Sequence, residues 1–215
     1  REVDAILHVL RCFEDDDITH VENTIDPIRD AEIIETELML ADIESLDRQM
    51  HNISKKARAN DKEAKADLLI MEELYKHLSD GTPIRLLNLS FEKVKRIKVF
   101  NMLSSKPLLY ACNVSEKDAA TGNNFSKLVF EKANKEQAET VIISGSIESE
   151  IALLDDDEKS EFLKDLSLEE SGLTRLIRAG FGFSALISLI ISTRSSLSTP
   201  QSRFRASNSF FANRS

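Results

Sequence analysis

The chain has 215 residues, of which 41% are hydrophobic and 30% are charged, so it is long enough to bury one core with an appended helical module. Its formal net charge is −9 at pH 7, and all 37 acidic residues lie at or before Glu170, which argues against nonspecific nucleic-acid binding through a broad basic face. Cys12 and Cys112 lie in apolar runs without CxxC spacing, which indicates neither a disulfide framework nor a zinc site and favours a reducing, cytoplasmic setting.

Three short apolar runs predict β-strands, at Ala5 to Phe13, Pro107 to Cys112 and Val141 to Ser144. None of the runs alternates cleanly between apolar and polar residues, which is typical of strands covered on both faces. Because helical patterns lie between the runs, we expect an α/β fold with a parallel sheet and right-handed crossovers. The carboxyl ends of the strands then open on one edge of the sheet. The polar segments brought to that edge are Glu14 to Asp17, Asn113 to Glu116 and Ser144 to Ser146.

The connection between the first two strands is too long for a single helix. Apolar residues recur with alternating spacings of four and three from Met39 to Ala57, and a second apolar seam runs from Ala64 to Leu78. Between the seams, Asn60 and Glu63 have the spacing of a capping box, with Asn60 as the cap of the second helix. We therefore expect an antiparallel coiled-coil hairpin over residues 30–80, inserted between strands of the α/β domain.

The tip of the expected hairpin is basic, with Lys55, Lys56 and Arg58 close together. Such charges belong either to a solvated coiled-coil surface or to a contact for a large anionic partner, and the pattern alone leaves both interpretations open.

The end of the chain has a different composition. The segment from Phe181 to Ser192 is apolar but only about a dozen residues long, shorter than the roughly 20 residues that span a bilayer, so we expect no membrane helix. From Ser192 onward the chain is rich in Ser and Arg and has no period, which is typical of disorder.

The segment Asn113-Val-Ser-Glu116 follows the second predicted strand directly. A buried strand that ends in an amide and a carboxylate is typical of a parallel sheet that presents polar groups to a ligand. Asn113 can donate and accept hydrogen bonds, Glu116 can accept them, and Val114 can lie against a planar ring, which together favour a site for a nucleotide base. The alternative is that Asn113 only caps the turn after the strand. No GxxxxGK[ST] phosphate loop and no GxSxG or HExxH motif occurs in the sequence.

Several segments taken together resemble the YchF group of Obg-like P-loop ATPases, and the resemblance extends from residue 1 to about residue 181. It implies a P-loop NTPase-type sheet that carries an inserted coiled-coil hairpin, binding of ATP with Mg²⁺, and association with the ribosome. The segments that carry the resemblance are Leu7 to Val21, Ile25 to Asp30, Asn113 to Glu116, Ser144 to Ile151 and Leu168 to Gly180.

The resemblance also implies roles for individual residues. Asn113 and Glu116 shape the edge of the base pocket, and Val114 contacts the ring. The family's Asn-x-x-Glu motif replaces the Asn-Lys-x-Asp of GTPases, and because adenine lacks the N1–H that a short Asp clamps in guanine, the longer Glu favours ATP. The complete set of cofactor-binding residues expected from the resemblance is Phe13, Asn113, Val114, Glu116, Ser144 and Gly145.

The sequence departs from the family in two places. The family's phosphate loop, switch regions and Asp-x-x-Gly magnesium motif precede the point at which this sequence begins, and the sequence after Phe181 is unrelated to the family's TGS domain. We therefore expect an amino- and carboxyl-terminally truncated fragment. Its expected parts are a partial nucleotide-binding domain (1–29), the coiled-coil insertion (30–80), the remainder of the nucleotide-binding domain (81–181) and a divergent tail (182–215).

Two functions stay open. In the first, the chain is a segment of a ribosome-associated ATPase that binds ATP in preference to GTP. In the second, it is a catalytically inert remnant that acts only as a coiled-coil interaction or scaffold module. The resemblance gives ATP and the ribosome as partners, and no pattern indicates a membrane or a specific DNA site. Whether the chain is itself an enzyme stays open because the family's catalytic motifs are not in it.

Overall fold

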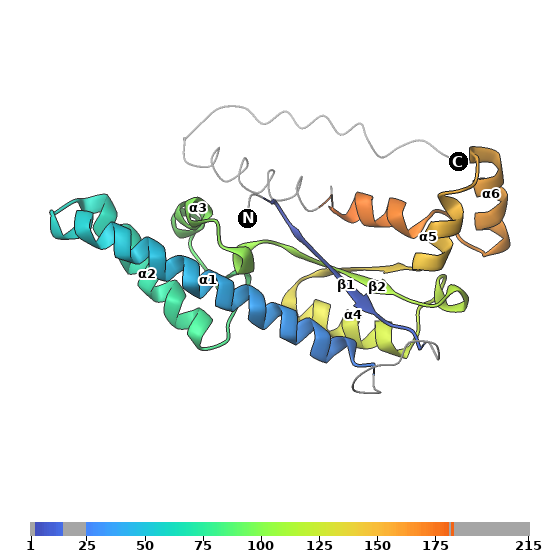
Figure 1. The fold of residues 1–215 in the computed structure, drawn as a ribbon, viewed down its shortest axis with the longest axis horizontal. Coiled ribbons are helices and arrows are strands. Elements are labelled where there is room, and N and C mark those ends of the chain that lie inside the picture. The colour runs from blue at the N-terminus through green and yellow to red at the C-terminus, as the bar shows by residue number, and fades with distance from the viewer. Residues whose placement is uncertain (1–2, 15–24, 181, 183–215) are drawn as a thin grey trace, which may run out of the picture.

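The fold is built on a parallel β-sheet (Figure 1). The structure, a computed structural model, describes residues 3–14, 25–180 and 182. In these residues β1 (Ile6–Arg11), β2 (Leu108–Asn113) and β3 (Glu139–Ile143) form a three-stranded sheet in the order β1-β2-β3. Both strand pairs are parallel, which confirms the predicted α/β class. The connecting helices are α1 (Pro27–Arg58), α2 (Lys62–Ser79), η1 (Ile84–Leu86), α3 (Phe91–Phe100), η2 (Leu103–Ser105), η3 (Glu116–Asp118), α4 (Asn124–Glu136), α5 (Gly145–Ile151) and α6 (Asp156–Asp165).

Helices cover the two faces of the sheet unequally. α1 and α4 pack on one face, over a core that includes Leu10, Tyr110 and Val129. Figure 1 shows α5 on the opposite side of the sheet from α4. The central strand β2 is buried along nearly its whole length, as predicted. The expectation is wrong for β1, because Leu7 and Val9 are 46% and 54% exposed, whereas Ile6, His8 and Leu10 on the face toward α1 and α4 are half-buried or buried.

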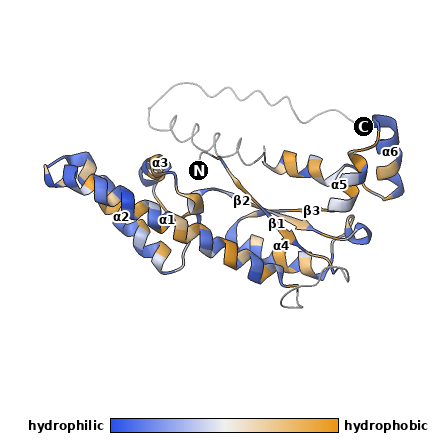
Figure 2. Ribbon diagram, in the orientation of Figure 1, coloured by the Kyte–Doolittle hydropathy of each residue, from blue (hydrophilic) through white to orange (hydrophobic). Residues whose placement is uncertain are grey.

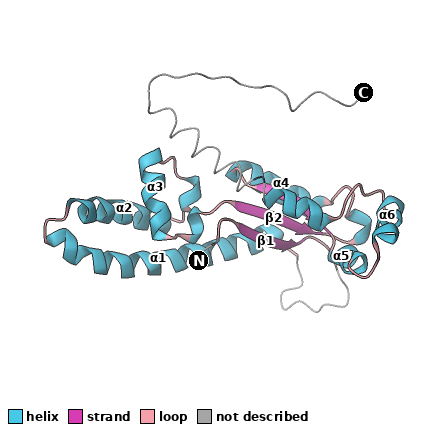
Figure 3. Cartoon of the chain, turned by 90° about the horizontal axis from the view of Figure 1, so that it is seen from above, coloured by secondary structure: helices cyan, strands magenta, loops and turns pink. Residues whose placement is uncertain are grey.

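Helices α1 and α2 form an antiparallel hairpin that extends away from the sheet (Figures 1 and 3). Figure 2 shows that hydrophilic residues make up much of both helices. Its apolar residues form a second core with α3, separate from the core at the sheet. The residues of this second core are Met39, Leu46, Met71, Leu74, Leu78, Ile84, Ile97, Phe100 and Met102.

The predicted capping box at the tip of the hairpin is wrong by one residue. Asp61, not Asn60, caps α2, and its Oδ1 accepts from the backbone N–H groups of Glu63 and Ala64 at 2.9 and 3.2 Å. Asn60 instead adopts the left-handed conformation, with φ of 70°, that reverses the chain between the helices. The side-chain oxygen of Asn60 accepts from Lys65 Nζ at 2.6 Å.

A buried carboxylate joins the hairpin to the strand that follows it. Asp42 in α1 is 0% exposed. Its two oxygens accept from the backbone N–H groups of Leu103 and Ser104 at 2.8 and 2.7 Å and from the Ser104 hydroxyl at 2.8 Å. These donors belong to η2, so Asp42 caps a short helix about sixty residues away in the chain.

A second polar cluster joins the base of the hairpin to α4. Arg85 forms ion pairs with Glu35 of α1 and Glu136 of α4, and Lys132 pairs with Glu136 at 2.6 Å. Tyr110 of β2 donates its hydroxyl to Glu136 at 3.0 Å. Burial, together with the Glu136 carboxylate, raises the pKa of Tyr110, so this hydroxyl stays protonated and remains a donor at neutral pH.

Some predictions fall outside what the structure describes. Of the acidic segment Glu14 to Asp17, the structure describes only Glu14. Of the region from Phe181 to Ser215, it describes only Gly182. In the described part of the chain, no helix has the length and apolar composition needed to cross a bilayer. The division into domains at residues 29, 80 and 181 stays a prediction.

Candidate functional site

The carboxyl ends of the three strands meet at one edge of the sheet, as the parallel topology predicts. There they surround a hollow of about 660 Å³, within the range of small-molecule sites. Phe13 follows β1, Asn113 ends β2, and Gly145 follows β3. The residues that line the hollow are Phe13, Asn113, Val114, Ser115, Glu116, Lys117, Gly145 and Ser146.

Asn113 links the ends of all three strands. Its side-chain Oδ1 accepts from the backbone N–H of Gly145 at 2.9 Å, and its backbone carbonyl accepts from the N–H of Cys12 at 2.7 Å. The bond from Gly145 uses the side-chain oxygen of Asn113, which leaves the Nδ2 group as a donor for a ligand. The alternative roles of Asn113, as a turn residue and as a base-binding residue, are therefore compatible with each other.

Glu116 lies at the opening of the hollow. It is exposed, and its Oε1 accepts from the hydroxyl of Ser146 at 2.8 Å. This bond ties η3, which begins at Glu116, to the first turn of α5. The second carboxylate oxygen can accept a hydrogen bond from a donor group on the edge of a planar ligand.

Val114 and Ser144 lie deeper than the sequence suggested. Val114 is 2% exposed and packs in the core with the free thiols Cys12 and Cys112, so its side chain has little surface left for a ligand. Ser144 is 3% exposed and is not among the residues that line the hollow. Its backbone carbonyl accepts from Glu148 N at 3.0 Å and so begins α5.

Phe13 lies at the rim of the hollow, and Arg11 fixes its position. The Arg11 guanidinium carbon lies 4.9 Å from the centroid of the Phe13 ring, and Arg11 Nε donates to the Phe13 carbonyl at 3.1 Å. The cation occupies one face of the ring. A planar ligand in the hollow can stack on the other face.

Comparison with known proteins identifies relatives of the chain. No protein-family model matches it. The ribosome-binding ATPase YchF of Haemophilus influenzae is 49% identical over 181 residues, and that of Bacillus subtilis is 42% identical over 188. These matches cover 84% and 86% of the chain but 50% and 51% of the relatives, so the chain spans about half the length of the curated relatives it matches. The resemblance to the YchF group of Obg-like ATPases is confirmed.

A solved structure supports the same conclusion. The Schizosaccharomyces pombe YchF GTPase is 31% identical and has a TM-score of 0.72, over 84% of this chain and 50% of that protein. Its description as a GTPase differs from the name ATPase that the bacterial relatives carry. The comparisons thus support a nucleotide-binding fold of the YchF type and leave the choice of base to be argued from the site.

Sequence reasoning missed the residues that brace the segment Asn113 to Glu116. Asp118 accepts from the Ser115 hydroxyl at 2.8 Å and from Asn123 Nδ2 at 3.0 Å. Asn123 also donates to the Cys12 carbonyl at 2.6 Å, which links the loop to the end of β1. The hydrogen bond from Asn123, followed by that from Ser115, lowers the pKa of Asp118. Lys117, which lines the hollow, was also missed, although it directly follows the recognised motif.

Proposed function

We propose that the chain forms the base-binding and hairpin-bearing part of a YchF-type ATPase and binds the adenine base of ATP at the carboxyl edge of its sheet. The observation that carries this proposal is the hollow in which Gly145 and Ser146 hold the side chains of Asn113 and Glu116 in place. A preorganised amide and carboxylate beside an aromatic rim suit a planar heterocycle. The bacterial relatives named ribosome-binding ATPase support the choice of nucleotide.

The preference for adenine rests on the length and attachment of Glu116. Guanine presents two neighbouring donors, N1–H and the N2 amino group, which a carboxylate binds best when both its oxygens are free. One oxygen of Glu116 already accepts from Ser146. The remaining oxygen suits a single donor such as the N6 amino group of adenine, while Asn113 Nδ2 can donate to a ring nitrogen.

The proposal covers binding of the base and gives no residue of this chain a role in binding the phosphates or Mg²⁺. The sequence has no GxxxxGK[ST] motif, and phosphate positioning with Mg²⁺ supplies most of the catalysis in P-loop enzymes. ATP with Mg²⁺ is the cofactor implied by the family, and we propose that the chain contributes the base-binding half of that site. We do not propose that the chain hydrolyses ATP by itself.

The hairpin is the proposed contact with the ribosome, in a cytoplasmic setting. Lys55, Lys56 and Arg58 are exposed in the last turn of α1, at the end of the hairpin far from the sheet. A basic tip on a long arm suits an anionic surface such as ribosomal RNA. The relatives named ribosome-binding support this assignment.

A second function follows from the separate core of the hairpin. Because α1, α2 and α3 share apolar residues that are distinct from the core at the sheet, the hairpin can act as an interaction or scaffold module without nucleotide. In that case the chain binds its partner equally well with and without ATP.

Nucleoside binding tests the base assignment. Adenosine and guanosine lack phosphates, so titrating each into the ¹⁵N-labelled chain reports on the base site alone, through the amide signals of Gly145 and Ser146. We expect adenosine to bind more tightly, and Glu116→Gln to weaken it by roughly tenfold or more, as for one hydrogen bond to a charged group. Glu150→Gln, an exposed charge loss on α5 outside the hollow, is the matched control. Tighter guanosine binding would disprove the preference, and no binding of either nucleoside would favour the scaffold function.

Cosedimentation with ribosomes tests the hairpin. We expect combined replacement of Lys55, Lys56 and Arg58 by Glu to abolish salt-sensitive cosedimentation. The control replaces three exposed lysines elsewhere by Glu, and they are Lys76, Lys95 and Lys164. Equal losses in both variants would show a nonspecific charge effect and reject the tip as the contact.

A further inference from the structure

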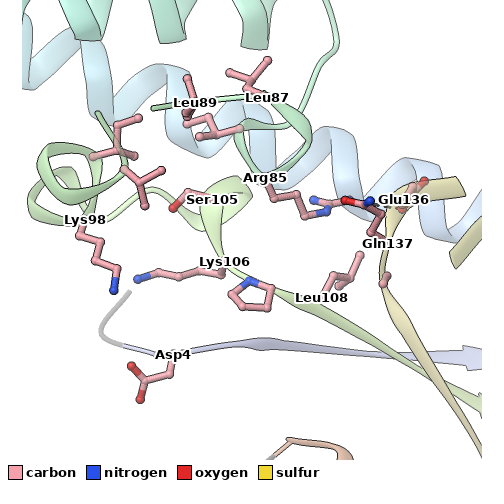
Figure 4. Close-up of a pocket in the computed structure, with 15 residues that line it drawn as sticks. Asp4, Arg85, Leu87, Leu89, Lys98, Ser105, Lys106, Leu108, Glu136 and Gln137 are labelled. Carbon is pink, nitrogen blue, oxygen red and sulfur yellow. Dashed lines mark hydrogen bonds and ion pairs between the residues drawn. The ribbon is translucent and has the colours of Figure 1, made fainter. Parts of the chain in front are cut away.

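A second hollow lies at the opposite edge of the sheet from the base site (Figure 4). It has a volume of about 600 Å³ and is bounded by η1, α3 and the start of β2. Pro107 and Leu108 at the amino end of β2 line it, whereas Asn113 at the other end of the same strand lines the base site. The two hollows are therefore separate, and this one takes no part in the proposed nucleotide binding.

One side of this hollow is apolar. Ile84 and Ile97 line it, but they are 2% and 3% exposed and belong to the core of the hairpin, so the surface open to a ligand comes from their neighbours. Those neighbours are Leu87 and Leu89, which are half-buried, and Val94, which is 38% exposed. Figure 4 shows the side chains of Leu87 and Leu89 at the hollow. An aliphatic or aromatic group placed here removes apolar surface from water, which favours binding.

The opening of the hollow is positively charged. Figure 4 shows the side chains of Lys98 and Lys106 directed toward one another, one from the end of α3 and the other from the residue before Pro107. Within the described residues, no hydrogen bond or ion pair joins either ammonium group to a carboxylate. Two converging cations repel each other, and an anion between them removes the repulsion.

The acidic residues near the hollow do not supply that anion. The Glu136 carboxylate already pairs with Arg85 and Lys132 and accepts from Tyr110. Figure 4 shows the Asp4 side chain directed away from the two lysines. The combination of an apolar wall and a cationic opening therefore fits a ligand that has one apolar end and one anionic end.

We propose that this hollow binds a small amphipathic anion, with a carboxylate or phosphate monoester head between Lys98 and Lys106 and an apolar body against Leu87, Leu89 and Val94. The volume falls within the range of small-molecule sites, which bury most of the ligand behind a few directional polar contacts. A ligand here contacts both α3 of the hairpin unit and the first residues of β2. Its binding therefore stabilises the junction between the hairpin and the sheet.

The probes are chosen to separate the head from the body. Decanoate and decyl phosphate carry both parts and differ in the acid, decanol lacks the charge, and acetate lacks the apolar body. Each is titrated, below its micelle-forming concentration, into the full chain with ¹³C-labelled isoleucine methyl groups. We expect saturable shifts at Ile84 and Ile97 with at least one of the two ten-carbon anions. We expect much weaker effects from decanol and acetate, and no shift at Ile147 near the base site.

Substitution of the lysines tests the head group. Lys98→Gln with Lys106→Gln removes both cations and should weaken binding of the anion by roughly tenfold or more, as for charge-assisted hydrogen bonds. Lys95→Gln, an exposed charge loss on the same helix but outside the hollow, should leave binding unchanged. The proposal is overturned if decanol binds as tightly as the anions, if the double variant binds as well as the native chain, or if neither anion shifts Ile84 and Ile97.

Discussion

The buried carboxylate of Asp42 gives a sharp test of how the hairpin is fastened to the rest of the fold. Three hydrogen bonds of 2.7–2.8 Å join it to the start of η2, and two of the donors are backbone N–H groups. Hydrogen bonds to charged groups contribute roughly 1.5–3 kcal/mol each, but they are not additive when they share an acceptor. Removing one partner of a buried charged interaction typically costs about 3–5 kcal/mol.

Two substitutions separate the loss of charge from the loss of the acceptor. Asp42→Asn keeps the shape and one oxygen but turns an NH₂ group toward a donor, so we expect a loss of about 2–3 kcal/mol. Asp42→Ala removes both acceptors and leaves two N–H groups unsatisfied, so we expect a loss of about 4–5 kcal/mol. Because whole domains are stable by only about 5–15 kcal/mol, both losses are large.

Urea unfolding followed by circular dichroism at 222 nm measures these losses as changes in the free energy of unfolding. The matched control is Asp47→Asn, at an exposed position just over one helical turn further along α1. We expect this control to change stability by no more than about 0.5 kcal/mol. If Asp42→Asn is as harmless as Asp47→Asn, the carboxylate does not hold η2, and another contact must fasten the hairpin.

Three further predictions concern other parts of the fold. Gly122→Ala should lower the free energy of unfolding by about 2 kcal/mol or more, because Gly122 has a φ of 71° and an added Cβ would lie 2.5 Å from Ser126 Oγ. Gly81→Ala is the control: an added Cβ there meets no atom within 4 Å, so only its left-handed backbone should cost about 1 kcal/mol. Urea unfolding measures both losses. Asn123→Ala removes a helix cap and two further hydrogen bonds, so it should lower the melting temperature and broaden the amide signals of the segment Asn113 to Glu116. Burial lowers the pKa of His8 against the opposing pull of nearby carboxylates, so the unfolded state gains its proton at a higher pH than the folded state does. Stability should therefore decline as the pH falls below about 6.5, and His8→Gln should reduce this decline in urea titrations at pH 5 to 8.

Local patterns were enough to predict the strands and the hairpin. The run Pro107 to Cys112 is apolar at consecutive positions, and it forms the buried central strand within one residue of the prediction. The alternating spacing from Met39 to Ala57 marks the inner face of α1, because a helix brings such positions to one side. Parallel topology then brings the strand ends together, which is why the convergence around Asn113 could be predicted before any coordinates.

Features that depend on distant partners could not be read from the sequence. Asp42 resembles an ordinary polar position in a helix until Ser104, which lies far along the chain, is placed beside it. Asp118 has the same difficulty, since its role depends on Asn123 reaching the end of β1. The exposure of Leu7 and Val9 was missed because an apolar run predicts a strand but does not show whether helices cover one face of that strand or both.

The direction in which the hairpin leaves the sheet depends on these polar contacts. The core at the sheet and the core of the hairpin are separate clusters, and apolar packing alone fixes no direction between them because it is not directional. Hydrogen bonds have preferred angles, and Asp42 and the cluster around Arg85 and Glu136 lie at the junction. Since a buried charge that loses its partner is costly, each contact resists a change in the angle of the hairpin. The tip proposed to meet the ribosome is thereby held in a defined position relative to the base site.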